Sequence, residues 1–287
     1  MTTEFCRHLG LFGAVMLTLS GVLPSAMADV VSPVQSSADP LKLPVVAPVE
    51  LAGSDAAAAA FMSALPSLKA LVNADLPEYK VNTAFAAANP VTLSDLLLTV
   101  DSEVRVYFVS EGASYRSSLG LNVIANATAL PTASTAKISS NAEWVFPDVS
   151  SNDPTTFYPS GNSVRTATAP LSAGDFVDLG TLKAGSLMDF FLGTNAVNGG
   201  STILTAETAR NSDAFQHIVA FQSGNYLILS FEDAVGGGDK DYNDAVIAIE
   251  ISPAVQTPEP GTWAALVFLC GAAGVNAWRK FPLARTA

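Results

Sequence analysis

Cysteine and positive charge are scarce in this chain of 287 residues. The two cysteines, Cys6 and Cys270, lie in apolar end segments, so the region between them can build neither a disulfide framework nor a cysteine-ligated zinc site. Lys and Arg number 14 against 26 Asp and Glu, and the resulting net charge of −12 argues against a nucleic-acid partner. The length is that of one domain with accessory segments, whose stability must come from a core, aided by any bound ions.

Histidine is equally scarce, which limits the chemistry open to the chain. His217 is the only histidine outside the first 28 residues, and it lies in an apolar strand pattern near Asn211 and Asp213. That setting is typical of a structural residue or a neighbour of a metal site rather than a catalytic base. No serine or cysteine nucleophile motif is visible. Glu232 and Asp239 could form a glycosidase-like carboxylate pair, but a bound cation explains the same residues better, so we expect a protein that is not an enzyme.

Negative charge is concentrated in the stretch FEDAVGGGDKDYND at Phe231–Asp244. Its five carboxylates, offset only by Lys240, would repel each other at close range unless a cation bound them. Ca²⁺ takes roughly six to eight oxygen ligands, and the glycines Gly236–Gly238 let the backbone fold around an ion. A solvated acidic turn is the alternative. We predict a calcium site whose ligands are Glu232, Asp233, Asp239, Asp241, Asn243 and Asp244.

Strand patterns flank the acidic stretch on both sides. Apolar residues alternate through 226–231 and again through 245–251, which indicates two strands joined by the acidic loop at the end of a sheet. The spacing from Asp239 to Glu250 imitates an EF-hand. The sixth position of that motif, however, is Asp244 rather than Gly. Glu250 would also lie ~20 Å along the following strand, too far to share the ion, so the match is accidental.

Short apolar runs separated by turn residues recur through the rest of the chain. They lie at Glu103–Val109, Leu119–Ala125, Glu143–Phe146, Phe176–Leu179, Leu187–Leu192 and His217–Gln222. Many short strands at such spacing predict an all-β domain, a β-sandwich or jelly roll, over residues 92–251. In the turn after the first of these strands, Glu111, Tyr115 and Arg116 could line a binding groove, but we favour a solvated turn.

Residues 29–91 have a different composition, rich in proline and alanine. Scattered prolines without periodicity predict an extended linker. It leads into a short helix with Ser54 as the N-cap and Asp55 in its first turn. We expect this helix to end at Pro66, and a further turn could follow through Val72. Whether it packs on the domain or serves as a spacer stays open.

The N-terminus has the pattern of a secretory signal peptide, residues 1–28. Arg7 and His8 precede an apolar run, and small residues follow it in an A-x-A arrangement that ends at Ala28. We predict cleavage between Ala28 and Asp29, and hence export. A buried N-terminal helix is the alternative, which the small residues after Pro24 make less fitting.

The C-terminus carries three features in a defined order. Pro258-Glu259-Pro260 lies in a linker at 252–262, an apolar transmembrane helix is expected at 263–278, and Arg279 and Lys280 open a basic cytoplasmic tail at 279–287. This order resembles the PEP-CTERM sorting signal of Gram-negative bacteria. The resemblance implies processing by an exosortase near the Pro-Glu-Pro motif after transient anchoring in the inner membrane. An uncleaved anchor is the alternative, and in both cases the body faces outward.

A second resemblance covers about residues 92–251. Five segments occur in order, at 110–120, 177–180, 189–192, 211–217 and 231–244, and together they resemble the bacterial extracellular domain-of-unknown-function family 4114. Its most specific part is FED, GGGD and DYND in one loop. The chain departs from the family at Gly193-Thr194-Asn195, where Asn-Gly is often found. The resemblance implies export and a β-rich fold, and it implies no reaction.

These patterns together predict an exported, non-catalytic calcium-binding protein of the cell surface or the exopolysaccharide (biofilm) matrix, processed by an exosortase. Residues 29–258 hold 10 Lys and Arg and 24 Asp and Glu, a net charge of −14 that suits cation binding and a hydrated matrix. The alternative is a carbohydrate-binding or hydrolytic domain that acts on exopolysaccharide.

Overall fold

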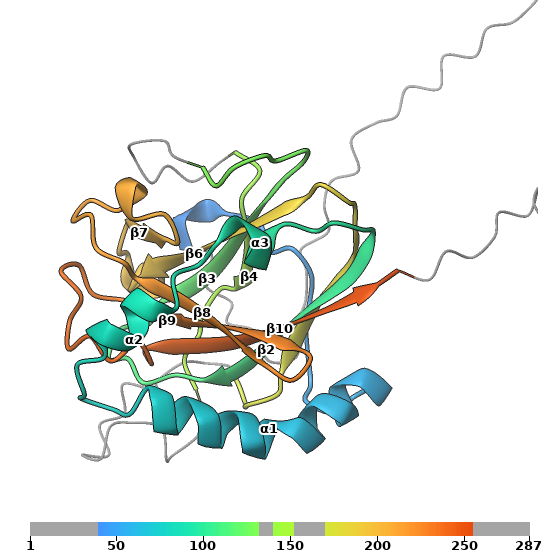
Figure 1. The fold of residues 1–287 in the computed structure, drawn as a ribbon, viewed down its shortest axis with the longest axis horizontal. Helices are drawn as coiled ribbons and strands as arrows, with labels where there is room; N and C mark the ends of the chain where they lie inside the picture. Colours follow the sequence, from blue (N-terminus) through green and yellow to red (C-terminus); the bar gives the residue numbers. More distant parts are fainter. Residues whose placement is uncertain (1–39, 132–139, 152–169, 255–287) are drawn as a thin grey trace, which may run out of the picture.

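Two antiparallel sheets packed face to face form the body of the protein (Figure 1). The structure is a computed structural model, and it describes residues 40–131, 140–151 and 170–254. In spatial order the six-stranded sheet contains β1 (Val49–Glu50), β5 (Phe176–Leu182), β2 (Ser102–Ser110), β10 (Ala245–Pro253), β9 (Tyr226–Phe231) and β8 (Ile218–Ser223). The four-stranded sheet contains β4 (Glu143–Phe146), β3 (Ser118–Ile124), β6 (Leu187–Thr194) and β7 (Thr202–Thr205). The predicted all-β class with paired sheets is therefore confirmed.

One α-helix of 20 residues, two short α-helices and three 3-10 turns complete the described chain. The α-helices are α1 (Ala56–Asp75), α2 (Thr83–Ala88) and α3 (Leu93–Leu96). The 3-10 turns are η1 (Pro40–Lys42), η2 (Ala196–Asn198) and η3 (Thr208–Arg210). The predicted signal peptide, Pro-Glu-Pro motif, membrane span and basic tail lie outside the described residues.

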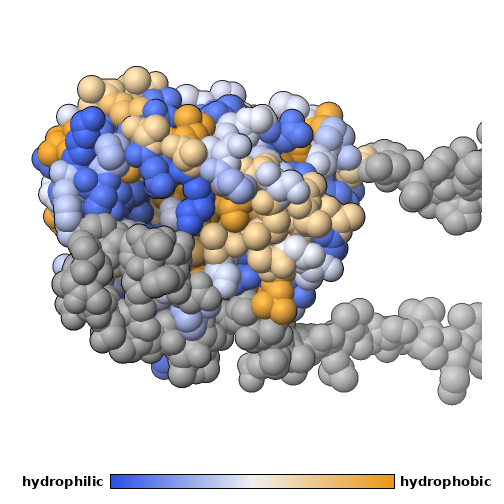
Figure 2. Space-filling model, turned by 90° about the horizontal axis from the view of Figure 1, so that it is seen from below, coloured by the Kyte–Doolittle hydropathy of each residue, from blue (hydrophilic) through white to orange (hydrophobic). Residues whose placement is uncertain are grey.

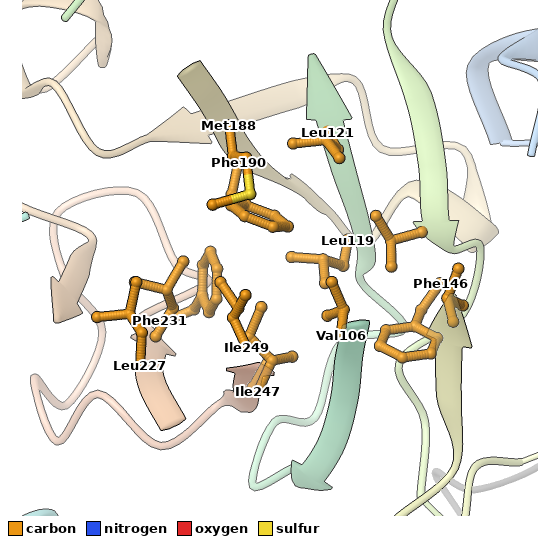
Figure 3. Close-up of a cluster of buried hydrophobic side chains, with 14 of the residues drawn as sticks. Val106, Leu119, Leu121, Phe146, Met188, Phe190, Leu227, Phe231, Ile247 and Ile249 are labelled. Atoms are coloured by element: carbon orange, nitrogen blue, oxygen red, sulfur yellow. The ribbon is translucent and has the colours of Figure 1, made fainter. Parts of the chain in front are cut away.

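The main core lies between the two sheets, and it is built by the alternation visible in the sequence. Alternate residues of β2, β9 and β10 point inward, where Leu119, Met188 and Phe190 of the other sheet meet them (Figure 3). Phe231 and Ile249 are fully buried there. Because side chains alternate between the two faces of a strand, the pattern at 226–231 and 245–251 fixes which face of the acidic loop's flanking strands points into the core between the sheets.

The opposite face of the six-stranded sheet is covered by α1, which runs beneath β2 and β10 in Figure 1. Tyr107 of β2 and Ile228 of β9 pack against Phe61 and Leu65 of the helix. The rings of Phe61 and Tyr107 stack with centroids 3.9 Å apart. The helix therefore packs on the domain rather than serving as a spacer.

The bounds of α1 correct two predictions. The N-cap is Asp55 and not Ser54, since the Asp55 carboxylate accepts a 2.8 Å hydrogen bond from Ala58 N–H. The helix also continues through Pro66, where we expected it to end. Pro66 lies on the exposed side, so water can solvate the carbonyl that the proline leaves without a partner. Burial of Leu68 and Val72 against the sheet region favours the continued helix.

Among the described residues, α1 is also the one helix long and apolar enough to cross a membrane by length and composition. One side of it is packed on the sheet, and the other is rich in exposed small apolar residues such as Ala56, Ala59 and Ala60. Figure 2, drawn from the side on which α1 lies, shows a patch of apolar residues toward the right of the described surface, whereas elsewhere on this face apolar and hydrophilic residues are mixed. The apolar composition of α1 thus belongs to a helix that packs on the six-stranded sheet.

Two strands were not predicted from the sequence. β1 has two residues and lies inside the segment that we predicted as linker, where Val49 pairs with Val177 of β5. β7 has four residues and pairs with the end of β6. Residues 40–91 thus contribute a strand and a helix that pack on the β-sandwich.

Candidate metal centre

The acidic loop, residues 232–244, joins neighbouring antiparallel strands at one end of the six-stranded sheet. Phe231 and Ala245 are paired partners, so both ends of the loop are fixed side by side as predicted. Three consecutive glycines have positive φ, and a side chain on Gly237 would collide with the ring of Phe215. Lys240 also has a left-handed φ, of 64°. Non-glycine residues in that conformation need support from their surroundings and often occur at ligand sites.

One set of carboxylates gathers at the mouth of this loop, and we call Glu78, Asp239 and Asp241 the outer group. Oxygen atoms of these three side chains lie within 4.8 Å of one another. Asp239 is exposed, Glu78 is half-buried and Asp241 is buried. Glu78 comes from the segment after α1, far from the loop in sequence. Three carboxylates this close require either protons or a cation between them.

The remaining acids of the loop, Glu232, Asp233 and Asp244, lie deeper, and we call them the inner group. Glu232 and Asp233 are 1% and 4% exposed. The Asp233 carboxylate accepts a 2.9 Å hydrogen bond from the Ser117 hydroxyl, and the Asp244 carboxylate accepts a 2.7 Å bond from Asp233 N–H. Two of the inner acids are therefore already held by hydrogen bonds within the protein.

Burial makes the ionised form of these acids costly. Desolvation, with nearby carboxylates adding to it, raises the pKa of Glu78 and of Glu232 to about 8. The same causes raise the pKa of Asp233 and of Asp241 to about 6, although hydrogen bonds from Ser117 and Tyr79 oppose the rise. Burial likewise raises the pKa of Asp244 well above its usual range. A divalent cation would reverse this preference, since its charge favours the carboxylate form.

Two buried oxygen atoms in the site have no hydrogen-bond partner among the described residues. They are Oε2 of Glu232 and Oδ1 of Asn243. A buried acceptor without a partner costs about 1–3 kcal/mol. A methyl group placed on Gly112 would lie 2.5 Å from Asn243 Oδ1 and 3.1 Å from Glu78 Oε2. Asn243 Oδ1 and Glu78 Oε2 therefore converge on one small space that Gly112 leaves open.

Two adjoining pockets meet at this point, and both are lined by Glu78 and Gly112. One, of about 200 Å³, also contacts the inner group and Asp239. The other, of about 300 Å³, is lined by Asn243 and by Glu111. Glu111 is only 3% exposed, so our interpretation of it as part of a solvated turn is wrong, because its strand end is covered by neighbouring segments. Side-chain oxygens of Glu78, Asp239 and Asn243 line these pockets together with apolar side chains such as Val72 and Leu76. Oxygen ligands of this kind suit a hard cation.

His217 lies directly beneath the loop and is fully buried. Its Nδ1 is 2.9 Å from the carbonyl oxygen of Glu232, and its Nε2 is 3.0 Å from the Asp213 carboxylate. Burial alone would raise the pKa of Asp213, but hydrogen bonds from the N–H groups of Gly236 and Phe215 and from His217 outweigh it and lower the pKa to about 2. Both ring nitrogens are thus engaged in holding the loop, as expected for a structural neighbour of the site.

Comparison with known proteins supports part of the family resemblance. Residues 182–252 match the family model described as "Domain of unknown function (DUF4114)". The match includes β6 to β10 and the acidic loop, and it leaves out Glu78. No curated protein matches the chain, and no solved structure matches it.

Proposed function

We propose that this protein is an exported, non-catalytic module that binds calcium in the acidic loop and acts at the cell surface or in an exopolysaccharide matrix. The observation that carries the calcium site is the gathering of the Glu78, Asp239 and Asp241 carboxylates within 4.8 Å of one another, beside the buried Oδ1 of Asn243. This amide oxygen and Glu78 Oε2 converge on the space beside Gly112. A cation bound there would be a partner for an amide oxygen that has none among the described residues.

The ligand chemistry favours calcium over other cations. The outer and inner groups and Asn243 offer oxygen atoms only, which hard cations prefer to the softer transition metals. Ca²⁺ accepts irregular oxygen arrangements at roughly 2.3–2.6 Å. Mg²⁺ requires a near-octahedral shell and gives up its water reluctantly. The acidic loop is built from backbone turns, so its oxygen atoms fit the irregular shell of Ca²⁺ more readily than the octahedral shell of Mg²⁺.

The place of action rests on the two ends of the chain and on its charge. The signal-peptide pattern at 1–28 directs export, and the Pro-Glu-Pro motif with the apolar segment 263–278 suits processing by an exosortase. The net charge of −14 over residues 29–258 suits a hydrated, cation-rich matrix better than adsorption to anionic lipid. The partners are therefore the processing enzyme, the inner membrane before processing, and exopolysaccharide.

Thermal unfolding of the purified protein tests the calcium site. A ligand that binds only the folded state at a hundredfold excess over its Kd stabilises by about 2.7 kcal/mol, which is a rise of several degrees in the midpoint. We expect millimolar calcium to give this rise, a chelator to remove it and magnesium to substitute poorly. Asp241→Asn should abolish the response. Glu250→Gln should keep it, because Glu250 lies along β10 and hydrogen-bonds Tyr107 instead. A wild-type midpoint that calcium and chelator leave unchanged would reduce the loop to a solvated acidic turn.

One observation favours a second candidate, a hydrolytic or carbohydrate-binding domain. A buried carboxyl whose pKa is about 8, as for Glu232, stays protonated near neutral pH as a general acid requires. Assay of the purified protein against matrix glycans distinguishes the two candidates. Turnover that disappears in Glu232→Gln would establish the enzyme, whereas calcium binding without turnover supports the module.

A further inference from the structure

The outer group does not belong to the acidic loop alone. Glu78 comes from residues 76–82, the segment that follows α1, and its carboxylate lies with those of Asp239 and Asp241 within 4.8 Å. The family match begins more than a hundred residues later, at Leu182, so it assigns nothing to this position. Like charges at this range destabilise the folded state. The presence of Glu78, from a distant segment, beside two other acids therefore needs an explanation.

Hydrogen bonds hold the segment against the loop in one register. Tyr79 N–H donates to the Asp241 carboxylate at 2.8 Å, and Asn82 N–H donates to the Lys240 carbonyl at 2.8 Å. The Asn243 amide donates to the Leu76 carbonyl at 3.3 Å. These contacts connect backbone and side chains on both sides of Glu78, so its position beside the loop is built into the fold.

Buried apolar contacts hold the same two segments together. Leu76 and Tyr242 are each 1% exposed and share a cluster with Val219 of β8. Tyr242 lies between Asp241 and Asn243 and has a left-handed φ of 61°. Anchoring of its ring therefore directs the side chains on either side of it toward the segment that carries Glu78.

An independent feature points to a ligand at this place. Asn243 is 9% exposed, and its Oδ1 has no hydrogen-bond partner among the described residues. This oxygen and Glu78 Oε2 converge on the space beside Gly112, where neither has a side chain in its way. A neutral amide oxygen that joins three carboxylates is a ligand set that Ca²⁺ accepts, with water completing the shell.

We propose that one calcium ion binds between Glu78, Asp239, Asp241 and Asn243, and so fastens the segment after α1 to the β9–β10 loop. The inference rests on the proposed function and deepens it by placing one essential ligand outside the acidic loop. It also divides the six predicted ligands. Asp239, Asp241 and Asn243 contact the ion, whereas Glu232, Asp233 and Asp244 form the base of the loop beneath it.

Calcium titration of the full chain by isothermal calorimetry tests this division. We expect one ion per wild-type chain, and a loss of affinity of at least tenfold in Glu78→Gln, comparable with the loss in Asp241→Asn. The matched control is Glu50→Gln, which removes the same charge from an exposed position on β1 and should bind as the wild type does. Gly112→Ala is a second variant that removes no charge. It should weaken binding because its methyl group enters the space between Asn243 Oδ1 and Glu78 Oε2.

Amide hydrogen exchange gives the second readout. Calcium should slow exchange at Tyr79 and Asn82 in the wild type and in Glu50→Gln, and should leave these amides unchanged in Glu78→Gln. Calcium binding that is equally tight in Glu78→Gln and in the wild type would overturn the inference and leave the proposed function standing. A wild-type chain that binds no calcium would overturn both.

Discussion

The docking of α1 on the sheet depends most on Phe61, and its truncation gives a measurable prediction. Phe61 is fully buried, stacks on Tyr107 at 3.9 Å between centroids and meets the edge of Tyr226 at 5.1 Å. Replacement of a buried Phe by Ala costs about 3–5 kcal/mol, and loss of the aromatic pairs adds about 0.5–1.5 kcal/mol for each. We expect Phe61→Ala to lower the free energy of unfolding by about 4 kcal/mol or more.

Urea unfolding followed by circular dichroism measures this loss, with the midpoint and the slope recorded separately. Ser63→Ala is the control at an exposed position of the same helix, where the hydroxyl hydrogen-bonds the Ala59 carbonyl. Its effect should stay within about 0.5 kcal/mol. A loss below about 1 kcal/mol in Phe61→Ala, or one equal to that of the control, would show that α1 is not part of the cooperative unit.

Three further predictions concern pH and processing. Without calcium, the unfolding midpoint should fall as pH rises from about 4.5 to about 8. The reason is that folding raises the pKa of Glu78 and Glu232 from the ordinary 4.5 to about 8, so the stability held by their protonated forms is complete below about 4.5 and is lost progressively until pH passes about 8. An unfolding midpoint that does not change with pH in the presence of chelator would contradict the raised pKa of these two carboxyl groups. The exported protein should begin at Asp29 on N-terminal sequencing, and a retained Met1 would show that no signal peptide is removed. Glu259→Ala should leave a full-length, membrane-bound precursor, whereas identical migration of mutant and wild type would indicate a plain anchor.

Local pattern was sufficient for the strands that carry the site. The alternation around Leu227 and Ile249 predicted which face of β9 and β10 points into the core between the sheets, because in a two-layer sandwich the inward residues must be apolar. The same patterns placed the acidic loop at the end of a sheet. The local pattern was insufficient where packing overrides it. Pro66 is the example, because α1 continues through it and packing of the helix's buried side on the sheet favours the additional turns.

Glu78 shows why the complete site could not be predicted from the sequence. Nothing in its neighbourhood of Leu76-Pro77-Glu78-Tyr79 distinguishes it from a surface acid. Its importance arises from its closeness to Asp239 and Asp241, some 160 positions away, and only the fold brings them together. The one local feature that could have pointed to Glu78 is its position just after the end of α1. Glu111 was misjudged for the same reason, since its burial comes from distant segments.

Anomalous diffraction from crystals grown with calcium tests the central claim most directly, because it locates the ion as well as detecting it. We expect one calcium peak within roughly 2.3–2.6 Å of oxygen atoms of Glu78, Asp239 and Asp241. A loop that keeps this conformation with no anomalous peak beside it at saturating calcium would contradict the account.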